Sequence, residues 1–272
     1  MKKLLLICAM VVCGIGQVHA QLEEDDFGFF NHVALGVSAG TDGIGVQLAA
    51  PLTSSFAVRA GYSFMPKFKY KKDINVGKDP AFLSYPNDQH VDLEGKLNMS
   101  DFSLLFDYYP SMYSSFRLTA GAYIGKSKPL SITNADAFLE RSSWGSKGLE
   151  LGTAGNDYTV VSDKATGNVQ ADLKVNSFKP YIGIGFGRAV PKGRVSVQFD
   201  LGIQIWGTPE VWTTFNTFDD NAGDWVTSYR KVNKNRITNP NEDYQDARDA
   251  IKTIEKIGVY PVLSLRINGR LF

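Results

Sequence analysis

Large apolar residues alternate with small or polar ones along much of the chain, most clearly between Lys179 and Gly207. The alternation runs through residues 181–187 and again through 195–205, and a period of two is typical of β-strands. Pro191 and Gly193 lie between the two runs and indicate a turn. The stretch therefore predicts an antiparallel hairpin with one aliphatic face and one face of small, polar or charged residues.

Six further segments repeat this alternation and bring the predicted strands to eight: 32–39, 44–50, 56–64, 101–108, 116–124 and 261–272. The half-exposed strands of a soluble β-sandwich alternate too, so the lengths of the connections decide. If both termini are periplasmic, the short turns at 51–55, 110–115 and 189–193 share the periplasmic side and every long loop lies outside. The predicted fold is an all-β membrane protein, an eight-stranded antiparallel up-and-down transmembrane β-barrel with long outer loops and one short α-helix before the last strand.

The long connections carry weaker signals. Apolar residues at 93, 97 and 99 have the opposite parity to the strand that follows, which predicts either a bulge near Ser100 or a strand extension beyond the membrane. Residues 158–161 and 169–173 read as a hairpin. A helix is expected over 242–257, capped by Asn239-Pro240 and ended by Gly258, with its apolar stripe against the barrel rim: Tyr244, Ala247, Ile251 and Ile254. The terminal Phe272 is out of phase with the last strand.

The amino terminus resembles an export signal. Lys2 and Lys3 precede a short apolar run that ends at Val18-His19-Ala20, which predicts a cleavable signal peptide over 1–20 and one barrel domain over 21–272. Both cysteines, Cys8 and Cys13, lie inside that segment, so no disulfide is expected in the mature protein. After it, no run reaches the roughly 18 apolar residues of a membrane helix. The predicted location is the outer membrane of a Gram-negative-type bacterium, with membrane lipid and the barrel-assembly machinery as partners.

Four fragments, in this order, resemble small outer-membrane barrels of the CarO type, the ornithine-uptake-porin-like group: LFDYYPSMYSSFRLTAGAYIGKSK, KPYIGIGFGRA, FDLGIQIWGTPEV and VYPVLSLRINGRLF. The resemblance covers most of the chain after the signal. It implies an eight-stranded barrel with a helix before the final strand, and a narrow porin for passive uptake of small solutes such as basic amino acids. The outer loops match no motif of that group, so a closed structural or surface-binding barrel is the alternative.

Six charged residues occupy inward positions of the predicted strands: Arg59, Asp101, Asp107, Arg117, Asp200 and Arg266. Arg59, Asp107 and Arg117 should share one level near the periplasmic end, whereas the other three should lie higher. The interior of an eight-stranded barrel is just wide enough for its side chains, so these groups form either a plug of ion pairs or a narrow charged path. Inward glycines leave room for water, or for Tyr123 and Tyr181.

Aromatic residues are frequent in the outer connections and are candidate ligand contacts or a small loop core: Phe82, Tyr85, Trp144, Tyr158, Trp212, Phe215, Trp225 and Tyr229. Only His32 and His90 remain after the signal for acid–base chemistry. His90 lies near Asp88 and Ser84, but a loop histidine is far more often a solvated side chain. We therefore expect no enzymatic activity, no cofactor and no metal site. The net charge of +1 also argues against a nucleic-acid partner.

Overall fold

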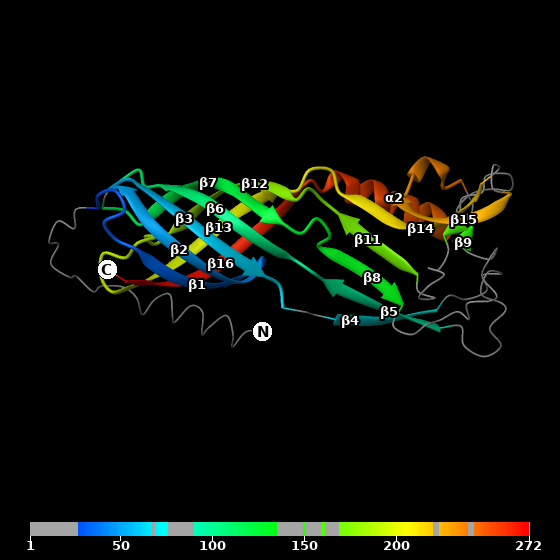
Figure 1. The fold of residues 1–272 in the computed structure, drawn as a ribbon, viewed down its shortest axis with the longest axis horizontal. Helices are drawn as coiled ribbons and strands as arrows, with labels where there is room; N and C mark the ends of the chain where they lie inside the picture. Colours follow the sequence, from blue (N-terminus) through cyan, green and yellow to red (C-terminus); the bar gives the residue numbers. More distant parts are fainter. Residues whose placement is uncertain are drawn as a thin grey trace.

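The computed structural model describes residues 27–66, 69–75, 90–111, 113–134, 149–150, 159–160, 169–219, 223–238 and 242–271. Two β-sheets follow one another along the long axis of the molecule (Figure 1). One sheet closes into a barrel, and the other stays open at one end of that barrel. We call the open sheet the extension. The predicted signal peptide lies outside the described residues.

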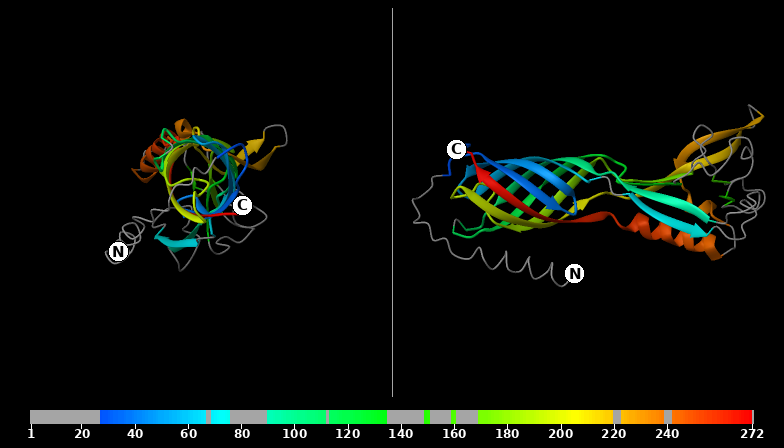
Figure 2. Two further views of the ribbon diagram at one scale, coloured as in Figure 1. Left: turned by 90° about the vertical axis from the view of Figure 1, so that its left-hand side faces the viewer. Right: turned by 90° about the horizontal axis from the view of Figure 1, so that it is seen from below.

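Eight antiparallel strands form the barrel: β1 (Ala34–Gly40), β2 (Gly43–Thr53), β3 (Phe56–Phe64), β6 (Ser100–Tyr108), β7 (Phe116–Gly125), β12 (Phe178–Phe186), β13 (Val195–Ile205) and β16 (Val259–Arg270). Each pairs with the next in the chain, and β16 pairs with β1 to close the ring seen end-on in Figure 2. The predicted eight-stranded up-and-down barrel is confirmed. Strand β16 ends at Arg270, and Phe272 lies outside the described residues.

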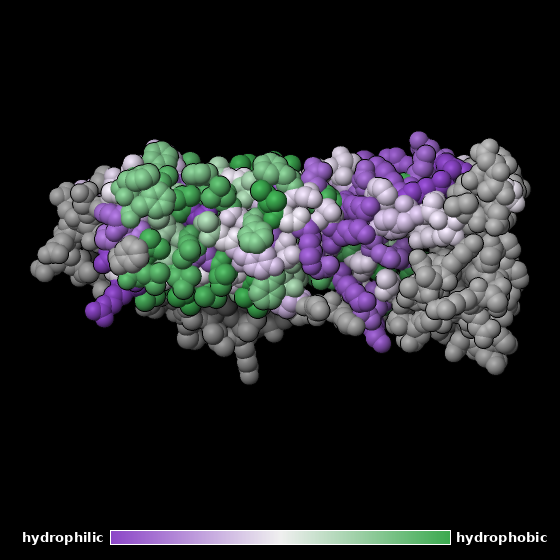
Figure 3. Space-filling view, viewed as in Figure 1, coloured by the Kyte–Doolittle hydropathy of each residue, from purple (hydrophilic) through white to green (hydrophobic). Residues whose placement is uncertain are grey.

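The outer face of the barrel is an apolar belt (Figure 3). Its large side chains are exposed, among them Leu35, Val37, Val46, Leu48, Leu104, Phe106, Ile182, Ile184, Leu201, Leu263, Leu265 and Ile267. Aromatic pairs border the belt. At the end with the short turns, the ring centres of Phe56 and Tyr108 lie 5.0 Å apart, and at the other end those of Tyr62 and Phe102 lie 4.8 Å apart. Such a surface is too apolar for water, and its aromatic borders match the two interfaces of a bilayer. The barrel therefore spans a membrane.

The extension continues five barrel strands beyond this belt. Its main strands are β4 (Lys69–Asn75), β5 (His90–Leu97), β8 (Leu130–Asn134), β11 (Gln170–Lys174) and β14 (Glu210–Asp219), and β15 (Asp224–Lys231) pairs with β14. The order β4-β5-β8-β11-β14 repeats the order β3-β6-β7-β12-β13, because each extension strand directly follows or precedes its barrel strand. Of the two alternatives for residues 93–99, the strand extension is therefore the one observed.

Backbone hydrogen bonds cross the junction between barrel and extension. The amide of Met65 donates to the carbonyl of Met99, that of Asn98 to Pro129, and that of Asn176 to Trp206, at 2.8, 2.9 and 3.0 Å. Strands β7 and β13 are interrupted here at segments that contain Pro129 and Pro209, since proline cannot donate to a ladder. The position of each extension strand is thus set by the barrel strand that it continues.

The predicted hairpin of residues 158–161 with 169–173 is wrong. Strands β10 (Thr159–Val160) and β11 both pair with β14, β10 opposite Phe215 and Asn216 and β11 opposite residues 210–213. They occupy successive stretches of one edge of β14 because β11 leads directly into β12 and must lie between β8 and β14. The other partner of β10 is β9 (Leu149–Glu150).

The expected helix, α2 (Glu242–Lys256), precedes the last strand. It packs against β14 and the short helix η1 (Lys234–Arg236), so its position against the barrel rim was wrongly predicted (Figures 1 and 2). Ile251 is its apolar contact with the buried Phe215, whereas Ala247 is exposed. The cap residues Asn239-Pro240 and the side chain of Tyr244 lie outside the described part. Among the described residues, no helix is long and apolar enough to cross a membrane.

Candidate functional site

Side chains fill the lumen at successive levels. The inward residues of β6, with Met99 and Tyr109 on either side of it, occupy these levels in order. From the short-turn end toward the extension, the inward residues are Tyr109, Asp107, Leu105, Ser103, Asp101 and Met99, and all except the half-buried Ser103 are buried. The charged Asp107 therefore lies between two apolar residues, whereas Asp101 lies between Ser103 and Met99.

The first charged level is a network of three arginines and two aspartates, which we call the lumen network: Arg59, Asp107, Arg117, Asp200 and Arg266. Arg59 Nε lies 2.7 Å from Asp107 Oδ2, and its Nη1 lies 3.2 Å from Asp200 Oδ2. Arg117 Nη2 and Arg266 Nη1 approach Asp200 at 2.5 and 3.0 Å. The side chains of Arg59, Asp107 and Arg117 are 0% exposed. Asp200 therefore joins all three arginines inside the barrel.

Asp107 completes the network on the opposite side from Asp200. It accepts a hydrogen bond of 2.7 Å from the Thr119 hydroxyl, and its Oδ1 lies 3.4 Å from Arg117 Nε. This is the predicted pair across the turn between β6 and β7. A buried carboxylate needs both charge and hydrogen-bond donors to offset its desolvation, and Asp107 receives both.

Two of the expected levels were wrong. Asp200 and Arg266 belong to the lumen network and do not lie above it, because Arg117 is opposite Gly185 and Gly185 is opposite Asp200 in the ladders. Asp101 lies outside the network and pairs with Lys179, whose Nζ is 2.7 Å from Asp101 Oδ1. Lys179 was missed, although it shares the inward parity of Tyr181, Gly183 and Gly185, and that alternation would have placed it in the lumen.

The inward glycines make room for large neighbours. A Cβ on Gly185 would lie 2.8 Å from the guanidinium carbon of Arg117, so this glycine lets Arg117 cross β12 to reach Asp200. A Cβ on Gly183 or Gly202 would lie 2.6 or 2.4 Å from the hydroxyl of Tyr181. The sequence left two uses for the space beside the inward glycines, namely water or large neighbouring side chains. At Gly183, Gly185 and Gly202 the side chains of Tyr181 and Arg117 fill that space.

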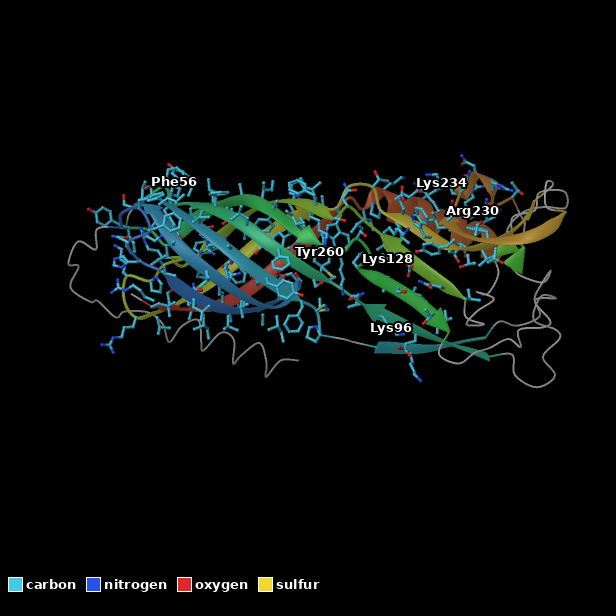
Figure 4. The ribbon with its side chains drawn as sticks, viewed as in Figure 1. Phe56, Lys96, Lys128, Arg230, Lys234 and Tyr260 are labelled. Carbon is cyan, nitrogen blue, oxygen red and sulfur yellow. The ribbon has the colours of Figure 1, made fainter. Side chains whose placement is uncertain are left out.

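Apolar side chains cluster at both ends of the lumen. Phe27, Tyr109, Ala189 and Val190 cluster at the short-turn end, where the amide of Ala189 donates to the Tyr109 hydroxyl at 2.8 Å. At the junction, the rings of Trp206 and Tyr260 stack at 4.6 Å, and Tyr260 is labelled there in Figure 4. The lumen network is therefore separated from both ends by packed side chains.

A second polar cluster lies on one face of the extension and centres on Asp172. This carboxylate accepts hydrogen bonds from Ser131 Oγ at 2.5 Å, Gln170 Nε2 at 2.7 Å and Lys128 Nζ at 3.0 Å, and from the Tyr229 hydroxyl. Burial alone would raise the pKa of Asp172, but the hydrogen bonds from Ser131, Tyr229 and Lys128 outweigh it and lower the pKa. Burial, reinforced by Asp172, raises the pKa of Tyr229 to about 12.

Beside Asp172, lysines surround two aromatic rings. The rings of Trp212 and Tyr229 lie 5.4 Å apart, and Lys174 Nζ lies 3.2 Å from the centre of the Trp212 ring and 4.7 Å from that of Tyr229. Lys231 Nζ pairs with Glu210 Oε1 at 3.0 Å, and the Trp212 indole donates to the same carboxylate. Among the described residues, Lys174 forms no ion pair. We call Lys128, Asp172, Lys174, Trp212 and Tyr229 the extension cluster; Lys128 is labelled in Figure 4.

The predicted loop aromatics have different positions. Trp212 and Tyr229 meet on the polar face, whereas Phe215 is buried on the opposite face with Val232 and Ile237. Trp225 pairs with Phe218 on the β14–β15 hairpin, and its side chain lies outside the description. The remaining four lie outside the described residues: Phe82, Tyr85, Trp144 and Tyr158. The lysines of the cluster were missed because their signal appears only once the strands are paired.

Of the two histidines after the predicted signal, the structure describes the side chain of His32 alone. His32 packs edge-on against Phe27 at 5.8 Å, and His90 begins β5 opposite Asn75, with its side chain outside the description. No group of three or more His, Cys, Asp or Glu side chains that could hold a metal ion occurs among the described residues.

Two solved structures from Acinetobacter baumannii are similar to this chain. CarO2 matches with a TM-score of 0.46 and 18% identity over 88% of this chain and 98% of that one. CarO matches with a TM-score of 0.46 and 17% identity over 89% and 99%. No protein-family model and no curated protein sequence matches the chain.

The first prediction concerns Asp200→Asn. Three arginines would then face a single carboxylate, and breaking a buried ion pair typically costs about 3–5 kcal/mol, so we expect unfolding at a markedly lower denaturant concentration. The measurement is denaturant unfolding in detergent, followed by heat-modifiable gel mobility. In Asp200→Asn/Arg266→Gln the excess charge is reduced, and part of the loss should return; strictly additive effects of the two substitutions would contradict a shared network.

The second prediction concerns acid. Because folding lowers the pKa of Asp172, its stabilising contribution is complete above the usual aspartate value of about 3.9 and is lost as the pH falls through the lower folded value. The near-ultraviolet circular dichroism from Trp212 and Tyr229 should therefore decline below about pH 4. In Asp172→Asn this acid transition should be absent. Identical pH profiles for the two proteins would show that another group controls the transition.

Proposed function

We propose that the protein is an outer-membrane barrel of a Gram-negative-type cell envelope, closed to solutes, whose extension binds an anionic ligand at the cell surface. The apolar belt and its aromatic borders support the membrane placement. The long connections all leave the same end of the barrel, and in bacterial barrels that end faces outward. The extension would accordingly stand in the external medium.

The packed lumen is the observation that carries this proposal. Five levels along β6 are occupied by buried side chains, and three members of the lumen network are 0% exposed. An open porin of this size would leave at least one face of these groups in contact with water. Eight strands enclose just enough space for side chains, so a passage would need the network to come apart.

Lys174 supports an anion as the ligand of the extension. The extension cluster and the neighbouring pair Glu210–Lys231 together hold three lysines, Lys128, Lys174 and Lys231, against two carboxylates, Asp172 and Glu210. Burial and the neighbouring Lys128 lower the pKa of Lys174, so a bound anion would relieve the repulsion. Tyr229 is 36% exposed, which gives a ligand access to this face. An acidic glycan offers both the charge and the area to contact these rings.

Passive uptake of small solutes such as basic amino acids is the second candidate. Two buried carboxylates near the extension end, Asp42 and Asp101, favour it because they would attract cations. Lys179 already neutralises Asp101, however, and the lumen network below holds three arginines against two aspartates. A basic solute would meet this positive charge inside the packed lumen, so we place uptake second.

The third prediction separates the two candidates by conductance. The refolded wild-type protein should give no channel steps in a planar bilayer, with or without a basic amino acid on one side. Arg59→Ala/Arg117→Ala should raise the leak, because two large side chains leave the lumen. Heat-modifiable mobility shows that each protein is folded. Reproducible wild-type steps that respond to the solute would replace our proposal with uptake.

The fourth prediction tests the ligand class with a heparin-derived oligosaccharide as the probe. Lys174→Gln should weaken binding roughly tenfold or more, since a hydrogen bond to a charged group contributes about 1.5–3 kcal/mol. The measurement is titration calorimetry in detergent at one fixed salt concentration. Lys96→Gln is the matched control, because Lys96 is an exposed lysine of the same sheet that pairs with Glu94 instead of lying on an aromatic ring. Equal losses in both variants, or equal binding of neutral dextran, would contradict the proposed site.

A further inference from the structure

The lumen network has an unbalanced charge. In the described parts of the chain, Arg59, Arg117 and Arg266 form ion pairs with Asp107 and Asp200 alone. Asp42, in the turn between β1 and β2, influences Arg266 only from beyond ion-pair distance. Within the network, three guanidinium groups against two carboxylates leave a local excess of positive charge, which the buried Asp42 offsets only at longer range.

Three hydrogen-bond donors near Arg266 find no acceptor among the described protein groups. They are Arg266 Nε, Gln198 Nε2 and Asn268 Nδ2, and all three side chains are at least nine-tenths buried. Gln198 is paired with Arg266 across β13 and β16, and Asn268 follows two positions later on β16. The Arg266 guanidinium itself contacts Gln198 Oε1 at 3.4 Å. These donors therefore come from adjacent inward positions of two paired strands.

Gly36, on β1, leaves space for two of these side chains, which come from β16. A Cβ at Gly36 would lie 2.0 Å from Asn268 Oδ1 and 2.9 Å from Arg266 Cδ, so both side chains lean over this glycine. The amide of Asn268 and the Nε of Arg266 consequently lie on one side of the barrel wall. Buried N–H groups in a native protein almost always have an acceptor. A water molecule could accept from them, but it would leave the excess positive charge in place.

We propose that the lumen network binds one small inorganic anion of about the size of chloride, held by Arg266 Nε, Gln198 Nε2 and Asn268 Nδ2. The anion balances the third arginine and accepts from the three unpartnered donors. Its size is limited because Leu105, Tyr123, Tyr181 and Val262 pack on one side of the network and the Phe27–Tyr109 cluster packs on the other. The anion is then part of the closed lumen, and it is independent of any ligand on the extension.

The experiment is thermal unfolding of the full-length mature protein, refolded in zwitterionic detergent, in chloride and in gluconate at equal ionic strength. Chloride and bromide should raise the unfolding temperature saturably, by about 2–4 °C or more, whereas gluconate is too large to enter. Equal unfolding temperatures in chloride and gluconate would overturn the proposal. In crystals grown with bromide, an anomalous peak should lie within hydrogen-bond distance of Arg266 Nε, and a peak only at the protein surface would also overturn it.

Variants separate the site from general salt effects. Gln198→Met should reduce the chloride-dependent shift several-fold, whereas Gln204→Met should keep it. Gln204 is a buried lumen glutamine on the same strand, but it lies opposite Tyr181 and accepts a hydrogen bond from Trp206, away from Arg266. Arg266→Met removes the excess charge, so it should lose the chloride dependence and be at least as stable as wild type in gluconate. An Arg266→Met protein that keeps the full chloride shift would place the anion elsewhere.

Discussion

The interior of an eight-stranded barrel is just wide enough for the side chains that fill it, so a charged group inside must be neutralised by another side chain or by a bound ion. Asp200 shows how closely this constraint is met, since one carboxylate receives Arg59, Arg117 and Arg266. The glycines follow from the same constraint. Gly185 has no side chain because Arg117 crosses its position, and Gly183 and Gly202 leave space for the ring of Tyr181. The same packing requirement therefore explains where the lumen has large side chains and where it has glycines.

The extension depends on the barrel in turn. Five barrel strands continue past the membrane in unchanged order, so the pairing of β5, β8, β11 and β14 is inherited from the strands below them. The extension stays open because β1 and β2 are joined by a tight turn at residues 41–42 and α2 precedes β16. An open sheet has two usable faces. One is covered by α2 and η1 over Phe215, and the other carries Asp172, Trp212, Tyr229 and their lysines.

Three cations face two carboxylates both in the lumen network and in the extension cluster taken together with Glu210 and Lys231, but the surroundings of the two groups differ. In the lumen the imbalance is buried, which calls for a small ion. On the extension it is accessible, and Lys174 is held over Trp212 by attraction to the ring, so a larger anion can reach it. This contrast is why we assign surface binding to the extension and consider the lumen as a closed structural part. It also explains why uptake of basic solutes is only the second candidate function, because neither cluster would attract a cation.

The sequence alone determined the barrel. A period of two, proline and glycine turns, and long connections confined to one end are local signals, and they identified all eight barrel strands and the helix before the last one. The same parity placed Arg59, Asp107 and Arg117 in the lumen. Only the tertiary structure decided which charges meet, because the stagger between tilted strands brings Asp200 level with Arg117 and leaves Asp101 to Lys179. It also decided the extension, whose short strands carry little periodicity and are positioned by the barrel strands that they continue.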